Sequence, residues 1–575
     1  MPNSDLQDAK ALSQLQELFA DEWEFRMQED PLFATRCGDH RFNDRLPAVS
    51  EADYQRRLAQ ERRFLERLRT IDRSLLAPDG QLNYRIFEQE LENRIADYGF
   101  HTYRMPFTKL GGFHTDFPEL PNAVPLNTLQ DYENYMARLN RFSAFAQAHI
   151  ELMRVGIREK VVLPRVVLSG IDDTIRAHIV QDPTRSLLYS PFERFPDRIN
   201  ESDRGRLREA GRTAIQDSVV PGYQALLRFV LDEYVPAARA EIAASSLPDG
   251  RTFYEHCVRK YTSLDLTPRQ VHDIGLEEVQ RVRAEMEDVI RQVGFAGDFH
   301  AFVDFLRTDD RFYVETPEAL TKEAALILKK IDGELPRLFK TLPRMPYGIR
   351  PVPDYIAPGT TTAYYLQPAG DGTRAGFYYV NTYDLGSRPL YELEALSLHE
   401  AVPGHHLQIA LQMELARLPN FRRFGWITAF GEGWALYAER LGLEVGFYQD
   451  AYSNFGRLTC EMWRSCRLVV DTGMHCLGWT RGQAIDFMAE NTALTLLNIA
   501  NEVDRYISWP GQALAYKIGE LKIRELRTLA EQELGTGFDL REFHDVVLRN
   551  GGIPLDVLET NVQNWIADLQ AGTGE

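Results

Sequence analysis

The residues with the clearest chemical potential lie between positions 399 and 406, where the chain reads HEAVPGHH. Three of the thirteen histidines fall in this stretch, together with one glutamate. Imidazole and carboxylate groups suit a catalytic zinc ion, which takes three protein ligands and a water. In the H-E-x-x-H arrangement of zinc hydrolases, the Glu beside the first His is the general base. The stretch therefore predicts metal-assisted hydrolysis, with His399 as a zinc ligand and Glu400 as the base.

The second ligand is less direct, because position 403, where H-E-x-x-H has its second His, is a proline. His399 and His405 are six residues apart, which in a regular helix means about 9 Å of rise and nearly opposite faces. Pro403 and Gly404 are poor helix residues and allow a deformation. If they are extruded as a bulge, His405 takes the missing position. We expect His405 as the second ligand, with His406 as the alternative.

The third ligand is expected to be a carboxylate on a later helix. The segment FGEGWALYAERLG at 430–442 offers Glu432 and Glu439 on one helical face. Glu432 lies between two glycines at the start of this helix, where the backbone can approach an ion closely. Glu439 is followed by Arg440 and has an ordinary ion pair as one explanation, and support of a ligand imidazole as another. The predicted site is therefore one zinc ion per chain, held by His399, His405 and Glu432.

The elements that must position these residues are mainly helical. Apolar residues at helical spacing predict helices over 51–72, 128–155, 205–245 and 268–293, and over the metal-binding segments 391–417 and 430–446. From 103 to 124, Pro, Gly and Phe alternate without period, which predicts a long ordered loop. From 355 to 385, β-branched and aromatic residues around Gly-Asp-Gly predict a small sheet of two short strands.

The fold class we expect is mainly α, with this small sheet beside the metal-binding helix. The strand at 376–385 is expected either to act as an edge strand that pairs with an extended substrate, or to be buried against the helix. A weak boundary near residues 248–250 separates an N-terminal helical region, 1–250, from a C-terminal catalytic region, 251–575. Nothing resembling a linker lies between them, so we expect one integrated body.

Composition excludes several classes of protein. Lys and Arg total 65 and Asp and Glu total 84, which gives a formal charge of −19 and argues against binding to nucleic acid or to an anionic membrane. No run approaches 18 apolar residues, the N-terminus lacks the pattern of a secretory signal, and five cysteines make no disulfide framework. We therefore expect a cytoplasmic location. Motifs for nucleotides, serine hydrolases and redox pairs are absent.

Three segments carry a resemblance to known families. His399-Glu400 followed by Gly404-His405-x-Leu407 resembles the zinc helix H-E-x-G-H-x-L of neurolysin-type oligopeptidases, with two residues inserted. EGWALY at 432–437 is similar to the E-G-F-A-x-Y segment of the alanyl-aminopeptidase group, whose Glu is the third zinc ligand. HEAVPGHHLQ, together with RYISWPGQALAYKIGELKIRELR, resembles a bacterial family catalogued as domain of unknown function 885. That match runs from GDHRFNDRLP at 38–47 to the C-terminal helix and is densest from 355 to 527.

This resemblance implies a helical metallopeptidase body with a deep central channel and a Tyr or His that stabilises the oxyanion. In relatives of the neurolysin and angiotensin-converting-enzyme type, that donor follows the zinc helices. The candidates for it here are Tyr516 and His475, which lies one helical turn after Asp471. The candidates for holding the substrate are Arg505, Tyr506 and Lys517, which flank a second Pro-Gly pair. With 25 tyrosines in the chain, a core position is the alternative for each Tyr.

The function we expect is zinc-dependent cleavage of peptide bonds in short peptides. Two alternatives use the same residues: a metal-dependent hydrolase of other amides or esters, and a metal-binding protein without turnover. A base beside His399 argues against the second of these, because a structural metal site does not need one. The sequence leaves open the oligomeric state, the choice between endo- and exopeptidase, and the metal bound in the cell.

Overall fold

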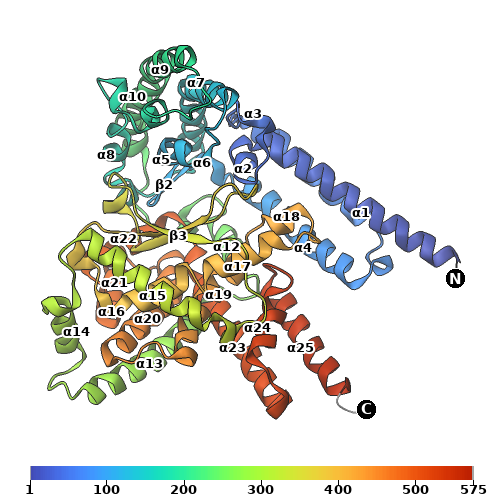
Figure 1. Cartoon of the computed structure of the whole chain (residues 1–575), viewed down its shortest axis with the longest axis vertical. Helices are drawn as coiled ribbons and strands as arrows, with labels where there is room; N and C mark the ends of the chain where they lie inside the picture. The colour runs from blue at the N-terminus through green and yellow to red at the C-terminus, as the bar shows by residue number, and fades with distance from the viewer. Residues whose placement is uncertain (1, 573–575) are drawn as a thin grey trace. The chain divides into compact units, whose positions relative to one another are not determined.

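The computed structural model describes residues 2–572 and confirms the mainly helical fold class (Figure 1). Within these residues the only sheets are a two-stranded and a three-stranded one. The chain forms two compact units. The first comprises the residues up to Glu241 with Ala369–Asp371 and Pro419–Phe421, and the second comprises the remainder. No helix in the described residues is both long enough and apolar enough to cross a membrane.

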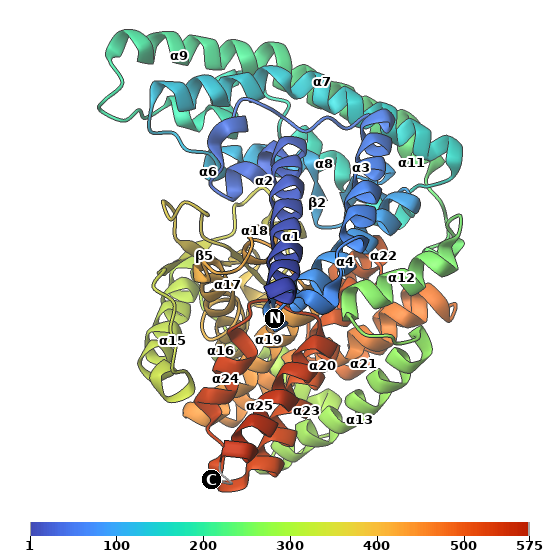
Figure 2. The same ribbon diagram turned by 90° about the vertical axis from the view of Figure 1, so that its right-hand side faces the viewer.

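The first unit is built from long helices joined by short ones. Its principal helices are α1 (Pro2–Glu29), α3 (Glu51–Arg69), α4 (Pro78–Gly99), α7 (Leu129–Glu159), α9 (Glu201–Ala214) and α10 (Val220–Phe229). Helix α7 begins where Thr128 and Asp131 form a capping box, which satisfies its first free N–H groups. Helices α7 and α9 lie side by side (Figure 2). The loop predicted at 103–124 contains short helical turns and a small antiparallel hairpin. Its strands, β1 (Phe107–Thr108) and β2 (Gly111–Gly112), have two residues each.

The second unit carries every predicted site residue. Its helices are α12 (Gly250–Thr262), α13 (Pro268–Val293), α14 (Phe299–Thr308), α15 (Pro317–Leu338), α16 (Leu390–Glu400), α17 (His405–Glu414), α18 (Asn420–Arg423, shared with the first unit), α19 (Thr428–Leu441), α20 (Ala451–Cys476), α21 (Arg481–Asn491), α22 (Leu496–Ser508), α23 (Ala515–Leu534), α24 (Leu540–Leu548) and α25 (Leu555–Gly572). The helix predicted at 268–293 is α13, which starts with a Thr267 capping box and ends at Gly294 in the left-handed conformation.

The sheet of the second unit has three strands in the order β3 (Tyr347–Pro351), β5 (Gly376–Val380) and β4 (Ala363–Leu366). Strands β4 and β5 are the antiparallel pair that the sequence predicts, and β3 adds a parallel partner from outside the predicted segment. Strand β5 is therefore central, and its main chain pairs on both sides. The expectation of an edge strand at 376–385 that binds substrate is wrong.

Helix α20 forms the centre of the second unit and packs against α13, α16 and α19 (Figure 1). Every residue from Phe455 to His475 is buried, including several charged ones. Close approaches hold the helices around it. An added Cβ at Gly433 of α19 would lie 2.5 Å from the Cα of Gly519 on α23, so neither helix can carry a side chain where they cross. This packing fixes α19, and with it Glu432, relative to α23, and α19 also packs against α16.

Candidate metal centre

The helix that carries HEAVPGHH is interrupted, as the Pro-Gly pair predicts. Helix α16 ends at Glu400 and α17 begins at His405. In the connection, the N–H of Gly404 donates to the carbonyl of Leu398 at 2.9 Å. A Cβ at position 404 would lie 1.9 Å from the carbonyl oxygen of His399, so only glycine fits. The chain thus folds back on the end of α16 and brings His405 toward His399.

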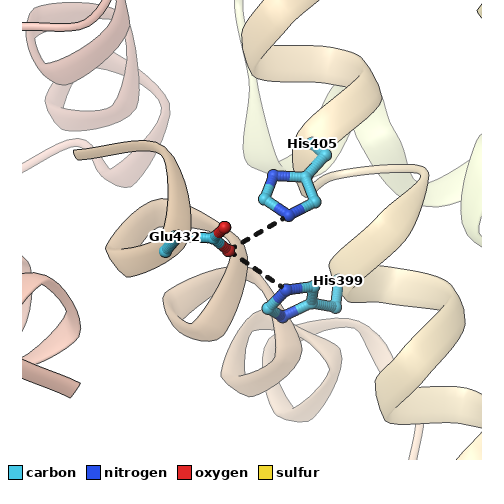
Figure 3. A group of neighbouring side chains, drawn as sticks. All are labelled: His399, His405 and Glu432. Atoms are coloured by element: carbon cyan, nitrogen blue, oxygen red, sulfur yellow. Dashed lines mark ion pairs between the residues drawn. The ribbon is translucent and has the colours of Figure 1, made fainter. Parts of the chain in front are cut away.

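His399, His405 and Glu432 form a compact cluster in which one ligand atom from each lies within 4.8 Å of the others (Figure 3). Oε2 of Glu432 is 3.3 Å from Nε2 of His405 and 3.8 Å from Nε2 of His399. All three residues are buried. Oε2 makes no hydrogen bond within the described part of the chain, although it is shielded from solvent. A buried carboxylate oxygen facing two imidazoles is an arrangement that a cation completes.

His406, the alternative second ligand, lies elsewhere. Its Nδ1 accepts a hydrogen bond from the hydroxyl of Tyr365 at 2.8 Å, and its Nε2 donates to the carbonyl of Met345 at 2.9 Å. Burial lowers the pKa of His406 to about 4. Both ring nitrogens are therefore engaged with the sheet region, and the structure places His405 rather than His406 beside His399 and Glu432.

Glu439 contacts His399 at Nδ1, the ring nitrogen that faces away from Glu432. Its Oε1 lies 2.8 Å from Nδ1 of His399, the imidazole contact that the sequence suggests, and 3.2 Å from Nη2 of Arg464 on α20. The ion-pair partner is thus Arg464 rather than the neighbouring Arg440. Because a carboxylate only accepts, Nδ1 of His399 carries a proton, and in the neutral ring the lone pair then lies on Nε2. Nε2 is the atom that faces Glu432.

The electrostatics of the cluster favour positive charge at its centre. Burial by itself lowers the pKa of His399, but Glu432 and Glu439 outweigh it and raise that pKa to about 9. Burial raises the pKa of Glu432, whereas His405 and His399 lower it to well below its usual range. The carboxylates therefore stabilise a bound proton, and a metal cation in its place would meet the same field.

The glycines beside Glu432 have a different role from the one expected. Glu432 is the fifth residue of α19, inside the helix and not at its start. Gly431 lies under the ring of Trp426, and Gly433 lies against α23. Both glycines therefore serve close packing between elements. It is the side chain of Glu432, and not the backbone beside it, that reaches the two imidazoles.

Glu400 directly follows His399 as the last residue of α16, and 8% of it is exposed. It lies within electrostatic range of Tyr378 on β5, where burial raises the pKa of the phenol and the charge of Glu400 raises it further. Glu400 therefore lies where the end of α16 meets the sheet.

Tyr516 lies next to the cluster from the side of α23. Its ring stacks on that of His399, with centroids 6.2 Å apart and planes at 16°. Its hydroxyl oxygen accepts hydrogen bonds from Nη2 of Arg505 at 3.0 Å and from Nε2 of Gln512 at 3.4 Å. Both bonds use its acceptor side, which leaves the hydroxyl hydrogen for a further partner. Arg505, expected to hold a substrate carboxylate, instead contacts Tyr516, Gln512 and Glu502.

The other predicted supporting residues are tied into the core. Nδ1 of His475 accepts from the N–H of Ala244, and Nε2 donates to the carbonyl of Tyr506. The carboxylate of Asp471, one helical turn before His475, accepts from Tyr254 and Gly511, so Asp471 is not the residue that orients this ring.

Tyr506 and Lys517 are also committed to buried partners. The hydroxyl of Tyr506 donates to Glu502 and accepts from Trp463 and Arg467. Nζ of Lys517 is completely buried and lies 2.9 Å from carboxylate oxygens of each of three residues, Glu278, Glu461 and Glu520. Networks of this kind hold helices together, and they replace the expected contacts of Tyr506 and Lys517 with a substrate.

Sequence reasoning missed three residues that contact the cluster or its supports. Trp426 and Tyr365 are in ring contact with His405, and Nε1 of Trp434 donates to the carbonyl of Pro403 at 2.8 Å. Trp434 belongs to the EGWALY segment that contains Glu432, so this motif could have indicated that Trp434 lies near the site. Trp426 and Tyr365 lie in a loop and a strand without any motif, and only the tertiary structure brings them here.

Two solved structures are similar to this chain over nearly its whole length. "The putative lipoprotein from Colwellia psychrerythraea" is 29% identical, with a TM-score of 0.91, and the match covers 97% of this chain and 99% of that one. "A putative lipoprotein of unknown function from Shewanella oneidensis" is 19% identical, with a TM-score of 0.66, over 96% and 99% respectively, and shows likeness of fold. No curated protein matches the chain.

The family match is equally extensive. Residues 31–562 match the family described as "Bacterial protein of unknown function (DUF885)". The match includes all three helices that carry the metal-ligand cluster, α16, α17 and α19, and most of the first unit. The chain therefore belongs to the DUF885 family of bacterial proteins.

Proposed function

We propose that this protein is a zinc-dependent hydrolase that cleaves peptide bonds of short peptides. The observation that carries the proposal is the convergence of two imidazole nitrogens and one carboxylate oxygen within 4.8 Å of one another. Two His and one Glu are the ligand set of known zinc peptidases. The peptide substrate is inferred from the resemblance of HEAVPGHHL and EGWALY to the zinc segments of peptidases.

The spacing of Glu432 from the two imidazoles fits a zinc ion, which His399, His405 and Glu432 would hold. Zinc with bonds of about 2.1 Å holds its ligand atoms about 3.4 Å apart. The measured distances from Oε2 of Glu432, 3.3 Å to His405 and 3.8 Å to His399, are close to this value. Bound zinc supplies Lewis-acid chemistry, which makes water a stronger acid and polarises a carbonyl. Glu439 and Arg464 keep His399 in the tautomer that presents Nε2.

The remaining steps belong to the chain's own residues. Glu400 takes the proton of the attacking water and delivers it to the leaving amine nitrogen, so the carboxylate is regenerated as the peptide C–N bond breaks. The hydroxyl hydrogen of Tyr516, whose oxygen is held by Arg505 and Gln512, donates to the oxyanion that forms on the carbonyl oxygen.

The decisive experiment separates metal binding from turnover. Glu400→Gln should abolish peptide cleavage while zinc content, measured by elemental analysis, stays at one ion per chain. His399→Ala and Glu432→Ala should lower zinc content instead. Glu444→Gln, at an exposed pair with Arg527, is the matched control and should change neither. Full activity of Glu400→Gln would remove the assigned base. A panel of peptides, N-acyl amino acids and esters distinguishes peptide cleavage from other hydrolysis.

We propose separately that the protein acts in the cytoplasm. The lack of a secretory-signal pattern and of a disulfide framework predicts the cytoplasm, whereas the two similar structures are described as a "putative lipoprotein" of their own organisms. Fractionation of cells that express the native gene, with detection by antibody, measures the location directly.

A further inference from the structure

One exposed aromatic side chain lies directly against the metal-ligand cluster. Trp426 is 44% exposed, yet its ring centroid is 5.7 Å from that of His405. The indole also covers Gly431, where an added Cβ would lie 2.1 Å from it. Single exposed apolar side chains are normal on protein surfaces. Among the large exposed apolar residues of the described chain, however, Trp426 is the one whose ring contacts a candidate metal ligand.

The loop that carries Trp426 is fixed to the helix that carries His405. Nε2 of Gln412, on α17, donates to the carbonyls of Arg422 at 2.8 Å and of Gly425 at 2.9 Å. Oε1 of the same side chain accepts from the N–H of Gly552 at 2.7 Å. One buried amide therefore ties the loop, α17 and the segment before α25 together. A ligand that contacts the indole meets a surface already in place, which lowers the ordering cost of binding.

A second ring lies near His405. Tyr365 of β4 has its ring centroid 6.5 Å from that of His405, with the planes at 26°, and its hydroxyl is bound to His406. His405 is thus in contact with the rings of both Trp426 and Tyr365. A group bound beside the metal ligands there would meet two aromatic rings, which suit apolar and aromatic groups.

We propose that Trp426 is the wall of a substrate subsite that accepts an aromatic or large aliphatic side chain adjacent to the scissile bond. This inference rests on the proposed peptidase function and names the class of peptide that the enzyme takes. Because the exposed indole is in ring contact with His405, selectivity at this subsite comes from apolar contact with Trp426.

The test measures binding apart from turnover. Zinc-loaded Glu400→Gln protein is titrated by calorimetry with N-acetyl Ala-Ala-X-Ala peptides in which X is Phe, Leu, Ser or Glu. The Phe and Leu peptides should bind about tenfold more tightly than the Ser and Glu peptides. Adding Trp426→Ala should reduce that difference to about twofold, and Trp426→Phe should retain most of it. Leu443→Ala, at a position with the same 44% exposure, should leave it unchanged.

The outcomes separate the inference from the function on which it rests. Zinc content and melting temperature establish that each variant is folded, and Trp426→Gln, which removes the apolar surface, replaces Trp426→Ala if the latter is not. Equal binding of all four peptides, an undiminished preference in Trp426→Ala, or no binding by any peptide each overturns the subsite. Failure of the zinc-loaded wild-type protein to cleave any peptide overturns the peptidase function, whatever the binding preference is.

Discussion

Nδ1 of His399 lies 2.8 Å from Oε1 of Glu439, and both side chains are almost completely shielded from solvent. Arg464 approaches the same oxygen of Glu439 from α20, which makes a buried line of imidazole, carboxylate and guanidinium. The line fixes the ring of His399 and presents its Nε2 to Glu432. A ligand oriented in this way has little freedom to lose when a metal binds.

We expect Glu439→Gln to weaken zinc binding about 10- to 100-fold, because a neutral amide holds the imidazole less firmly and makes it a poorer donor. Competition with a chromogenic chelator measures the affinity. Glu444→Gln is the matched control, since that carboxylate pairs with Arg527 on the surface. An affinity equal to that of the wild type would show that Glu439 serves the fold alone.

Gly404→Ala should disrupt the connection between α16 and α17. The new Cβ would meet the carbonyl oxygen of His399 at 1.9 Å, and backbone atoms there cannot move without displacing the ligand. We expect a loss of about 1–3 kcal/mol in the free energy of unfolding, and a lower zinc content. Urea titration and elemental analysis measure the two effects.

Gly333→Ala is the control for that substitution. Position 333 lies in α15 with no atom within 4 Å of an added Cβ, so alanine there should be neutral or stabilising by up to about 1 kcal/mol. If Gly404→Ala retained wild-type stability and zinc content, the backbone would be able to deform, and the close contact would not define the site.

Lys517→Met should destabilise the protein without lowering zinc affinity. The substitution removes one buried cation from Glu278, Glu461 and Glu520, which also pair with nearby arginines. Breaking a buried pair costs about 3–5 kcal/mol when it leaves a charge unpaired, and the remaining arginines make that an upper bound, which urea titration would measure. Lys322→Met, at an exposed pair with Glu318, should cost at most about 1 kcal/mol. A stable Lys517→Met protein that binds peptides poorly would instead restore the substrate-binding role.

The free energy of unfolding should decrease as the pH is lowered, in part because of His149 in the first unit. Burial lowers its pKa to about 3, and its ring stacks on Phe113 with centroids 3.9 Å apart. Between pH 6.5 and 3 the unfolded chain binds a proton that folded His149 does not bind, so stability decreases as the pH falls. The loss is about 1.4 kcal/mol per pH unit below 6.5.

The matched measurement compares unfolding curves at pH 7 and pH 5.5 for the wild type and for His149→Phe. Phenylalanine keeps the ring stack but cannot titrate, so the variant should lose about 1.4 kcal/mol less than the wild type over this interval. His300→Phe, at an exposed position, should follow the wild type. Identical pH dependence of His149→Phe and the wild type would exclude His149 as a cause.

The helices could be predicted from the sequence because their signals are local. The apolar spacing of residues 268–293, the Thr267 cap and the following Gly294 define α13 without reference to any other segment. The sheet was predicted only in part. Strand β5 and its antiparallel partner β4 are neighbours in the chain, whereas β3 comes from before the predicted segment and pairs in parallel. A parallel partner leaves no turn signal, so the central position of β5 was not visible.

For the candidate site, the sequence by itself determined which chemistry the residues could perform. Two histidines, a neighbouring Glu and a later Glu suit a metal-dependent hydrolase, and the Pro-Gly pair indicates where the helix must break. Only the tertiary structure decided which side chains meet. The fold of the connection places His405, and not His406, beside His399, and the crossing of α19 with α23 sets Glu432 opposite both. The same packing draws Lys517 and Arg505 into buried ion pairs, because the partner of a charged side chain depends on contacts between helices far apart in the chain.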